Sequence, residues 1–351
     1  MSLRPMIKGV LTRVRTVLSR LQTRGPKQRQ PDEPGPMHSL AKLIENFAGP
    51  ESAAEVLYLG DSVVERVSRN DRDTRTLGEM VNSCLNGRLS VVSITRTGYH
   101  LGVFRGVVHA LAAMPSRPKT LVFPVNMRSF SPQWDLRPMW QYDEEIRALE
   151  QYAASPREPV SVIAERAERD ADLELFDSVK VQYPMTTLSS IGEFRQVIAR
   201  RHGDSDARRL RLRQVFIFHY LHALAPDHRR IVGLQDVLNT VNAVGMRGLV
   251  YISPVNYLAG IRYVGTEFEE LLRANVARVC EVIKPFEDSG RVRLQDWSLS
   301  FDSTGFFHGD EPTEHLGQLG RRSLARQIAG EIVELSRVED GSSSPSGGWV
   351  T

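Results

Sequence analysis

Five short apolar runs most constrain what this chain can fold into. They are residues 55–59, 89–94, 120–125, 248–253 and 291–294, with the sequences EVLYL, LSVVSI, TLVFPV, GLVYIS and RVRL. Each run is continuous rather than alternating, which is typical of parallel strands covered on both faces. Helical patterns separate the runs, so the sequence predicts a three-layer α/β domain around a five-stranded parallel sheet.

The clearest helical pattern begins at Thr266. Thr266 and Glu269 have the spacing of a capping box, in which each side chain binds the other residue's backbone N–H. Apolar residues then recur at helical spacing at Phe268, Leu271, Leu272, Val276, Val279 and Ile283. The pattern therefore predicts a long helix between the fourth and fifth strands.

The connection between the third and fourth strands is too long for one crossover helix. It spans about 115 residues and contains several helical patterns, among them those at 161–179 and 206–224. We expect a helical insertion at about 132–246 that caps the carboxyl edge of the sheet and shapes a substrate pocket. A dimerisation surface is an equally simple interpretation.

The two ends of the chain differ in composition from its middle. Residues 1–31 hold eight Lys or Arg and no acid, and their apolar residues recur at helical spacing. This predicts a basic amphipathic helix that contacts an anionic membrane surface through residues 4–24, although a packing helix or a disordered start fits as well. A Pro-rich linker closes the segment 1–37, the α/β domain is expected at 38–338, and residues 339–351 are a predicted disordered tail.

Composition argues against several partners and cofactors. A net charge of +3 on 351 residues gives no reason to expect nucleic acid as a partner. The sequence has no G-x-G-x-x-G or Walker pattern, and no ligand set that completes His219 and His222, so we expect no cofactor and no metal. No run reaches the roughly 20 apolar residues of a membrane span, and charges interrupt the N-terminal segment too early for a secretory signal. We therefore expect a cytoplasmic protein, peripheral at the inner face of the membrane.

Polar residues follow several of the predicted strands. Gly60-Asp61-Ser62 follows the first, Gly98 follows the second, and Asn126 and Arg128 follow the third. Ligands of open α/β sheets bind outside the carboxyl ends of the strands, so these residues are expected at one site. Ser62 alone is ambiguous, because Ser at a strand-to-helix turn is also a favoured N-cap.

A loop after the fifth strand supplies the groups that a nucleophilic serine needs. It contains His308, Asp310, Glu311 and His315 before the last predicted helix. A serine hydroxyl needs a base to take its proton, an acid to orient that base, and donors for the oxyanion.

This ordered set resembles the SGNH, or GDSL, hydrolase superfamily over roughly residues 54–334, excluding the insertion. The resemblance implies a flavodoxin-like sheet, with Ser62 as nucleophile and His315 as base. It also implies an oxyanion hole formed by the N–H groups of Ser62 and Gly98 and the side chain of Asn126.

The family is defined by short sequence blocks that follow successive strands, and two of them differ in this chain. The third reads Pro124-Val125-Asn126-Met127 where the family has Gly-x-Asn-Asp. The family places the acid three residues before the histidine, where this chain has Pro312. We therefore expect Asp310 to be the catalytic acid, with Glu311, Glu314 or no acid as alternatives.

Further residues are expected to line the substrate pocket, namely Asp61, Arg128 and His308. Asp61 is also expected to hold the turn before Ser62. Arg96, Arg105 and Arg128 lie near predicted strand ends, where Arg can bind an anionic group in a bidentate way.

The resemblance implies a serine esterase or an O-acyltransferase that forms an acyl-enzyme on Ser62. Its expected substrate is a small-molecule or glycan ester, in particular an acylated carbohydrate or a lipid-linked substrate. The sequence leaves open the acyl group, the acceptor, hydrolysis against transfer, and the oligomeric state. A noncatalytic binding or assembly protein that keeps the scaffold is the alternative, which the altered spacing before His315 favours somewhat.

Overall fold

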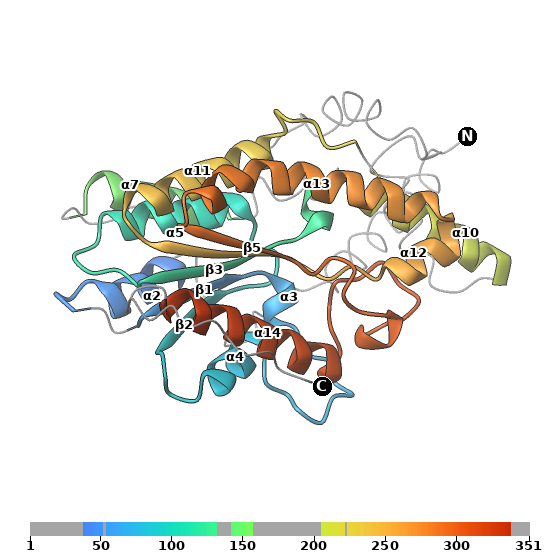
Figure 1. The fold of residues 1–351 in the computed structure, drawn as a ribbon, viewed down its shortest axis with the longest axis horizontal. Helices are drawn as coiled ribbons and strands as arrows, with labels where there is room; N and C mark the ends of the chain where they lie inside the picture. The colour runs from blue at the N-terminus through green and yellow to red at the C-terminus, as the bar shows by residue number, and fades with distance from the viewer. Residues whose placement is uncertain (1–37, 52–53, 132–141, 157–204, 222, 338–351) are drawn as a thin grey trace, which may run out of the picture. The chain divides into compact units, whose positions relative to one another are not determined.

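The five apolar runs form one parallel sheet in the computed structural model (Figure 1). The strands are β1 (Val56–Gly60), β2 (Val91–Thr95), β3 (Thr120–Val125), β4 (Arg247–Ile252) and β5 (Val292–Asp296). Their order is β2-β1-β3-β4-β5, and every neighbouring pair is parallel. This is the flavodoxin-like order, in which ligands bind where the strand order reverses, between β1 and β3. The predicted fold class is confirmed.

The structure describes residues 38–51, 54–131, 142–156, 205–221 and 223–337. Contacts divide the chain into Met1–His38 and Ser39–Thr351, and the sheet belongs to the second unit. The predicted basic helix, linker and tail lie outside the described residues. Within those residues, no helix combines the length and the apolar character needed to cross a membrane.

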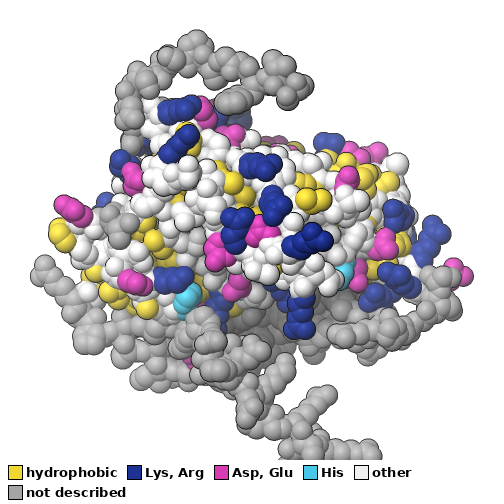
Figure 2. All heavy atoms as spheres, turned by 90° about the horizontal axis from the view of Figure 1, so that it is seen from below, with side chains coloured by type: hydrophobic (Ala, Val, Ile, Leu, Met, Phe, Trp, Pro, Cys, Tyr) yellow, Lys and Arg dark blue, Asp and Glu magenta, His cyan; other side chains and the backbone are white. Residues whose placement is uncertain are grey.

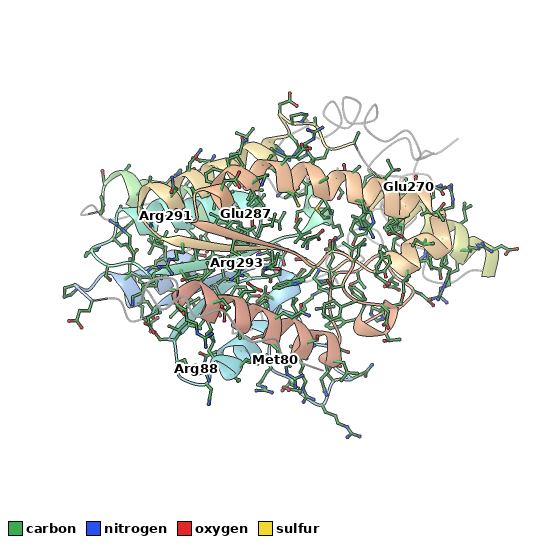
Figure 3. The ribbon with its side chains drawn as sticks, in the orientation of Figure 1. Met80, Arg88, Glu270, Glu287, Arg291 and Arg293 are labelled. Atoms are coloured by element: carbon green, nitrogen blue, oxygen red, sulfur yellow. The ribbon has the colours of Figure 1, made fainter. Side chains whose placement is uncertain are left out.

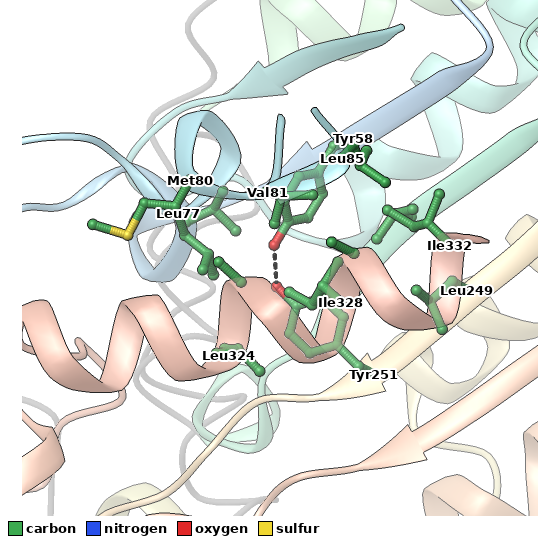
Figure 4. Packing of buried hydrophobic residues seen from close by; sticks show 14 of the residues in the cluster. Tyr58, Leu77, Met80, Val81, Leu85, Leu249, Tyr251, Leu324, Ile328 and Ile332 are labelled. Carbon is green, nitrogen blue, oxygen red and sulfur yellow. Dashed lines mark hydrogen bonds between the residues drawn. The ribbon is translucent and has the colours of Figure 1, made fainter. Parts of the chain in front are cut away.

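Helices α4 (Leu77–Leu85) and α14 (Gln318–Arg337) pack together on the lower face of the sheet in Figure 1. Figure 4 shows their apolar side chains against Tyr58 of β1 and Tyr251 of β4, whose hydroxyls are 2.7 Å apart. That bond satisfies two polar groups in an otherwise apolar cluster. Each large side chain buried there contributes roughly 1.5–3 kcal/mol to folding.

Four helices form the layer on the opposite face of the sheet. They are α5 (Leu101–Ala112), α7 (Asp143–Ala154), α11 (Arg229–Ala243) and α13 (Glu267–Asp288). Phe104 of α5 packs edge-on against Phe123 of β3, with ring centroids 6.1 Å apart. Helix α2 (His38–Phe47) opens the described chain and buries Leu40, Leu43 and Phe47.

The remaining helices are short or lie near the ends of the strands. They are α3 (Ser62–Glu65), η1 (Met127–Phe130), α10 (Ser205–Tyr220), α12 (Tyr257–Val264) and η2 (Ser303–Gly305). The pattern at 206–224 corresponds to α10, which contacts α12 and η1, whereas the pattern at 161–179 lies outside the described residues. Within the expected insertion, α7 and α11 belong to the upper helical layer and both contact α5.

The long helix predicted from Thr266 is α13, but its capping box is not formed. Thr266 has helical backbone angles and its side chain makes no capping bond. Glu269 is unavailable, because its carboxylate accepts hydrogen bonds from Arg273 one turn later. A capping box forms instead at Thr76 and Glu79, at the start of α4.

Candidate active site

The turn between β1 and α3 begins with a glycine that cannot be replaced without movement. A Cβ added at Gly60 would lie 2.5 Å from Cγ2 of Val64 and 3.0 Å from Cγ2 of Thr95. Real Cβ atoms essentially never come that close to another carbon, so this tight turn requires glycine. The turn places the next two residues just beyond the carboxyl end of the strand.

Asp61, and not Ser62, is the N-cap of α3. Its backbone is extended, and its Oδ1 accepts a hydrogen bond of 2.8 Å from the N–H of Val63. The interpretation of Ser62 as a helix cap is therefore wrong. Because Asp61 performs the capping, the hydroxyl of Ser62 is available for another partner.

That partner is His315, which lies 253 residues further along the chain. Ser62 Oγ and His315 Nε2 are 3.0 Å apart. Their exposed fractions are 5% and 8%, so little of either group meets solvent. The loop before α14 thus brings an imidazole within hydrogen-bond reach of the hydroxyl at the first turn of α3, as a base–nucleophile pair requires.

The other nitrogen of His315 faces a hydroxyl rather than a carboxylate. Nδ1 is 3.2 Å from Oγ1 of Thr313, which also accepts a hydrogen bond of 3.0 Å from the backbone N–H of His315. If Nδ1 donates its proton to Thr313, the lone pair of the imidazole lies on Nε2 and points at Ser62.

Asp310, the expected acid, lies elsewhere. Its carboxylate binds Arg262 at 2.8 Å and Arg208 at 3.7 Å, and 44% of its side chain is exposed. These arginines hold the carboxylate at the surface, so the expected role of Asp310 is corrected. The rival Glu311 contributes its backbone carbonyl, which accepts a hydrogen bond from Asn256.

Glu314 is fully buried and pairs with Arg128 rather than with His315. Its Oε1 accepts a hydrogen bond of 3.1 Å from the backbone N–H of Arg128, and its Oε2 is 3.4 Å from Nε of the same residue. Burial raises the pKa of Glu314 to about 7, although the Arg128 guanidinium opposes that shift. Only 12% of the Arg128 side chain is exposed, so its expected substrate contact is replaced by this internal pair.

Asn126 is held at the end of β3 by its side chain, which also interacts with the Glu314 carboxylate. Its Oδ1 accepts a hydrogen bond of 3.1 Å from the N–H of Arg128, and its Nδ2 donates one of 3.3 Å to Oδ2 of Asp61. Asp61 thus uses one oxygen on its own helix and the other on Asn126, which replaces its expected substrate contact. Burial raises the pKa of Asp61, an effect that these hydrogen bonds and Arg128 oppose.

Two backbone N–H groups near the site lack acceptors within the described part of the chain. They belong to Ser62 and Gly98. Gly98 has a φ of +89°, a conformation that glycine adopts without strain. It follows β2, which lies beside β1 in the sheet, so Gly98 and Ser62 follow adjacent strands at the same edge.

The surroundings of His315 disfavour its protonated form. Burial is the largest cause, followed by electrostatic interaction with Arg128, Arg66 and His308, and together they lower the pKa of His315 to about 3. The Phe307 ring also lies beside the imidazole, with centroids 5.7 Å apart. The imidazole is therefore neutral at pH 7, as a proton acceptor must be. His308, which was expected in the pocket, is half-buried and close enough to act on this pKa.

Asn256 organises the loop that carries His315. It is fully buried, and its Nδ2 donates hydrogen bonds of 3.0 Å and 3.1 Å to the carbonyls of Gly309 and Glu311. Its Oδ1 accepts one of 2.8 Å from the hydroxyl of Ser303. Sequence reasoning missed Asn256 and Thr313. The signal for Asn256 was its place just after β4, at the edge where the other site residues were sought.

The described residues offer no metal-ligand cluster. Among them, no group of three or more His, Cys, Asp or Glu side chains could hold a metal ion.

No protein-family model and no curated protein matches the chain. Among solved structures, it is similar to an acetylxylan esterase from Geobacillus stearothermophilus, at 10% identity and a TM-score of 0.40, over 80% of this chain and 95% of that one. It is also similar to a protein described as an acylhydrolase from Bacteroides fragilis, at 9% identity and a TM-score of 0.38, over 85% and 94% of the two chains. Similarity at this level does not assign an activity, which has to come from the residues of the site.

Proposed function

We propose that this protein is a serine esterase or O-acyltransferase of the SGNH type that forms an acyl-enzyme on Ser62. The observation that carries the proposal is the 3.0 Å contact between Ser62 Oγ and His315 Nε2. The availability of that hydroxyl supports it, because Asp61 caps the helix in place of Ser62. A serine that only formed the turn would not require a buried imidazole within hydrogen-bond reach of its hydroxyl.

In the first step, His315 Nε2 takes the hydroxyl proton while Ser62 Oγ attacks the ester carbonyl. The carbonyl oxygen becomes an oxyanion, which we assign to the N–H groups of Ser62 and Gly98 and to the side-chain amide of Asn126. In the absence of substrate this amide donates to Asp61, and the Asn126 side chain also interacts with the Glu314 carboxylate, so the oxyanion would have to take over one of these contacts. The intermediate then collapses, the leaving alcohol takes the proton from Nε2, and the acyl group stays on Ser62.

In the second step, water or an acceptor hydroxyl attacks the acyl-enzyme with His315 again as the base. Attack by water restores Ser62 and completes hydrolysis. Attack by an acceptor hydroxyl restores Ser62 and completes transfer of the acyl group. Thr313 holds the imidazole through both steps, since its hydroxyl is the partner of Nδ1. The pair works without a carboxylate on Nδ1, so it resembles a dyad more than a triad.

Substrate class and location extend this proposal beyond the site. We expect a glycan ester or a lipid-linked ester, and contact with an anionic membrane through residues 4–24, on the grounds of the resemblance and the basic N-terminal segment. Sedimentation with vesicles of anionic and of neutral lipids tests the contact. Equal binding to both kinds of vesicle, or to neither, contradicts it.

Acyl-enzyme trapping tests the chemistry. We expect p-nitrophenyl acetate to release p-nitrophenol and to leave an acetyl group on the peptide that contains Ser62, as intact mass and peptide mapping would show. Ser62→Ala should abolish the adduct, and His315→Ala should remove most of the rate. Release that survives in Ser62→Ala at the parent's rate contradicts the proposal.

Adding an alcohol acceptor then separates the two reactions. A transferase yields the acetylated acceptor at the expense of acetate, whereas an esterase yields acetate alone. The alternative, a noncatalytic binding protein, predicts no adduct in a folded parent.

A further inference from the structure

Three arginines that the sequence suggested as anion-binding residues already pair with glutamates of this chain. Each has a glutamate partner: Arg96 with Glu145 at 3.8 Å, Arg105 with Glu150 at 2.8 Å, and Arg128 with Glu314 at 3.4 Å. Arg96 also lies over the ring of Tyr142. None of the three is therefore a good candidate for an incoming anion.

Arg66 is different. It is the C-cap of α3, and its backbone N–H donates a hydrogen bond of 3.0 Å to the carbonyl of Ser62, one helical turn earlier. Its side chain is exposed and, within the described part of the chain, has no carboxylate partner. Its charge nevertheless reaches the catalytic base, because Arg66 is one of the groups that lower the pKa of His315.

The carboxylates nearest to Arg66 in the sequence are used elsewhere. Glu65 accepts a hydrogen bond of 2.7 Å from the hydroxyl of Thr97. Asp71 pairs with Arg321 at 2.7 Å, and Asp73 pairs with Arg75 and Arg322 at 2.7 Å and 3.0 Å. Figure 2 shows basic and acidic side chains interspersed on the face that carries α4 and α14. Arg66 therefore carries a positive charge one helical turn after Ser62, on the same short helix, and these neighbours do not neutralise it.

We propose that Arg66 binds an anionic group of the ester substrate, a carboxylate or a phosphate, next to the bond that Ser62 attacks. The inference deepens the proposed function and rests on it for the roles of Ser62 and His315. A guanidinium offers two parallel N–H donors that match the oxygens of either group.

The same contact assists the reaction. His315 becomes an imidazolium when it takes the proton, and no carboxylate faces its Nδ1. A substrate anion on Arg66 offsets one of the positive charges that oppose this protonation. The substrate thus supplies part of the negative charge that a triad obtains from its acid.

Two esters of nearly equal shape test the proposal, namely 4-acetoxybenzoate, which is anionic, and 4-acetoxybenzamide, which is neutral. The measured quantity is the ratio of kcat/KM for the anionic ester to that for the neutral ester, in the full chain. We expect the parent to prefer the anion, and Arg66→Gln to lower the ratio roughly fivefold to tenfold, the size of a partly exposed charge-assisted contact. Arg66→Lys should recover part of it.

Arg88→Gln is the matched control. Arg88, which Figure 3 labels, is also an exposed arginine, but it precedes β2 and so lies at the amino end of the sheet, whereas Ser62 follows the carboxyl end of β1. We expect Arg88→Gln to leave the ratio of kcat/KM for the anionic ester to that for the neutral ester unchanged. General damage to the site in Arg66→Gln would slow both esters alike and also leave the ratio unchanged, which would overturn the proposal.

Binding separates this inference from the proposed function. If the parent hydrolyses neither ester in a Ser62-dependent way, the proposed function fails, and calorimetry with 4-acetamidobenzoate and 4-acetamidobenzamide decides about Arg66. Tighter binding of the anion by the parent, with the preference lost in Arg66→Gln, supports the anion site. Equal binding of the two compounds, or a preference that Arg66→Gln retains, overturns it.

Discussion

His315 has a hydroxyl where a triad has a carboxylate. Thr313 Oγ1 lies 3.2 Å from Nδ1 and 3.0 Å from the backbone N–H of the same histidine. A hydroxyl can fix the tautomer and the ring orientation, but it carries no charge to stabilise an imidazolium. The position of the imidazole is therefore well defined, although no carboxylate of the described residues faces its Nδ1.

In the proposed mechanism, Thr313 positions the imidazole. We expect Thr313→Ala to lower kcat roughly tenfold, about the value of one buried hydrogen bond, with a smaller change in KM. Thr313→Ser keeps the oxygen and should restore most of the rate. Steady-state kinetics of the three proteins checks this, and equal losses in the Ala and Ser variants would show that the methyl group matters instead.

The pH dependence follows from the direction of the His315 shift. In the proposed mechanism His315 must be neutral to take the proton, and burial together with Arg128, Arg66 and His308 lowers its pKa from 6.5 to about 3. Lowering the pH from 8 to 4.5 therefore should not protonate it, and kcat/KM for a neutral ester should show no loss that is due to His315. A loss near pH 6.5 in both the parent and Glu314→Gln would contradict this. A loss near pH 7 that Glu314→Gln removes belongs to Glu314, whose pKa is raised to about 7.

At the scale of elements, the site depends on how closely β1 passes into α3. The absence of a side chain at Gly60 lets Val64 pack over the turn, where a Cβ would meet its Cγ2 at 2.5 Å. We expect Gly60→Ala to destabilise the fold by roughly 1–3 kcal/mol through overpacking, and to weaken the contact between Ser62 and His315. Urea unfolding measures the first effect, and hydrolysis rates the second.

Gly330→Ala is the control for that substitution. Gly330 is an exposed residue inside α14, and a Cβ there would meet nothing within 4 Å. Alanine should stabilise this helix by roughly 0.5–1 kcal/mol. A loss of stability at position 330 as large as that at position 60 would show that steric crowding is not the cause.

The Glu314–Arg128 pair joins the loop of the base to the turn that follows Asn126. Removing the cation leaves a buried carboxyl without compensation, so we expect Arg128→Met to cost roughly 3–5 kcal/mol at pH 8. A carboxyl whose pKa is raised on folding stabilises the fold fully below its unfolded value, 4.5, and loses that contribution as the pH rises through about 7. Without Arg128 that pKa rises further, so the deficit should be smaller at pH 5.

Urea unfolding at the two pH values measures the deficit. The double variant Glu314→Gln, Arg128→Met has no carboxyl at position 314 to ionise. Its loss of unfolding free energy should therefore be no larger at pH 8 than at pH 5. A deficit in Arg128→Met that is equal at both pH values would contradict the account.

At the scale of the whole molecule, much of the fold could be predicted from the apolar runs. Continuous runs separated by helical patterns predict a parallel sheet, and the observed strands lie within two residues of the predicted ends. Ligands of such sheets bind outside the carboxyl ends of the strands, which lie at one edge. Inspecting the residues that follow each strand therefore pointed to Ser62, Gly98 and Asn126. Neither step needed tertiary contacts.

The rest could not be predicted, because it depends on such contacts. The sequence shows Asp310 near His315 but not the arginines that draw it away, Arg262 from α12 and Arg208 from α10. Likewise Glu314, adjacent to His315, pairs with Arg128 across 186 residues. In a loop, sequence distance alone does not indicate which way a side chain points.

The central claim is that Ser62 is an activated nucleophile, and labelling with a fluorophosphonate probe tests it most directly. The parent, Ser62→Ala and His315→Ala would be treated alike, then examined by intact mass and peptide mapping. We predict one label on the parent, located at Ser62, no label on Ser62→Ala, and greatly slowed labelling of His315→Ala. A folded parent that takes no label, or labelling of Ser62 that does not depend on His315, would contradict the account.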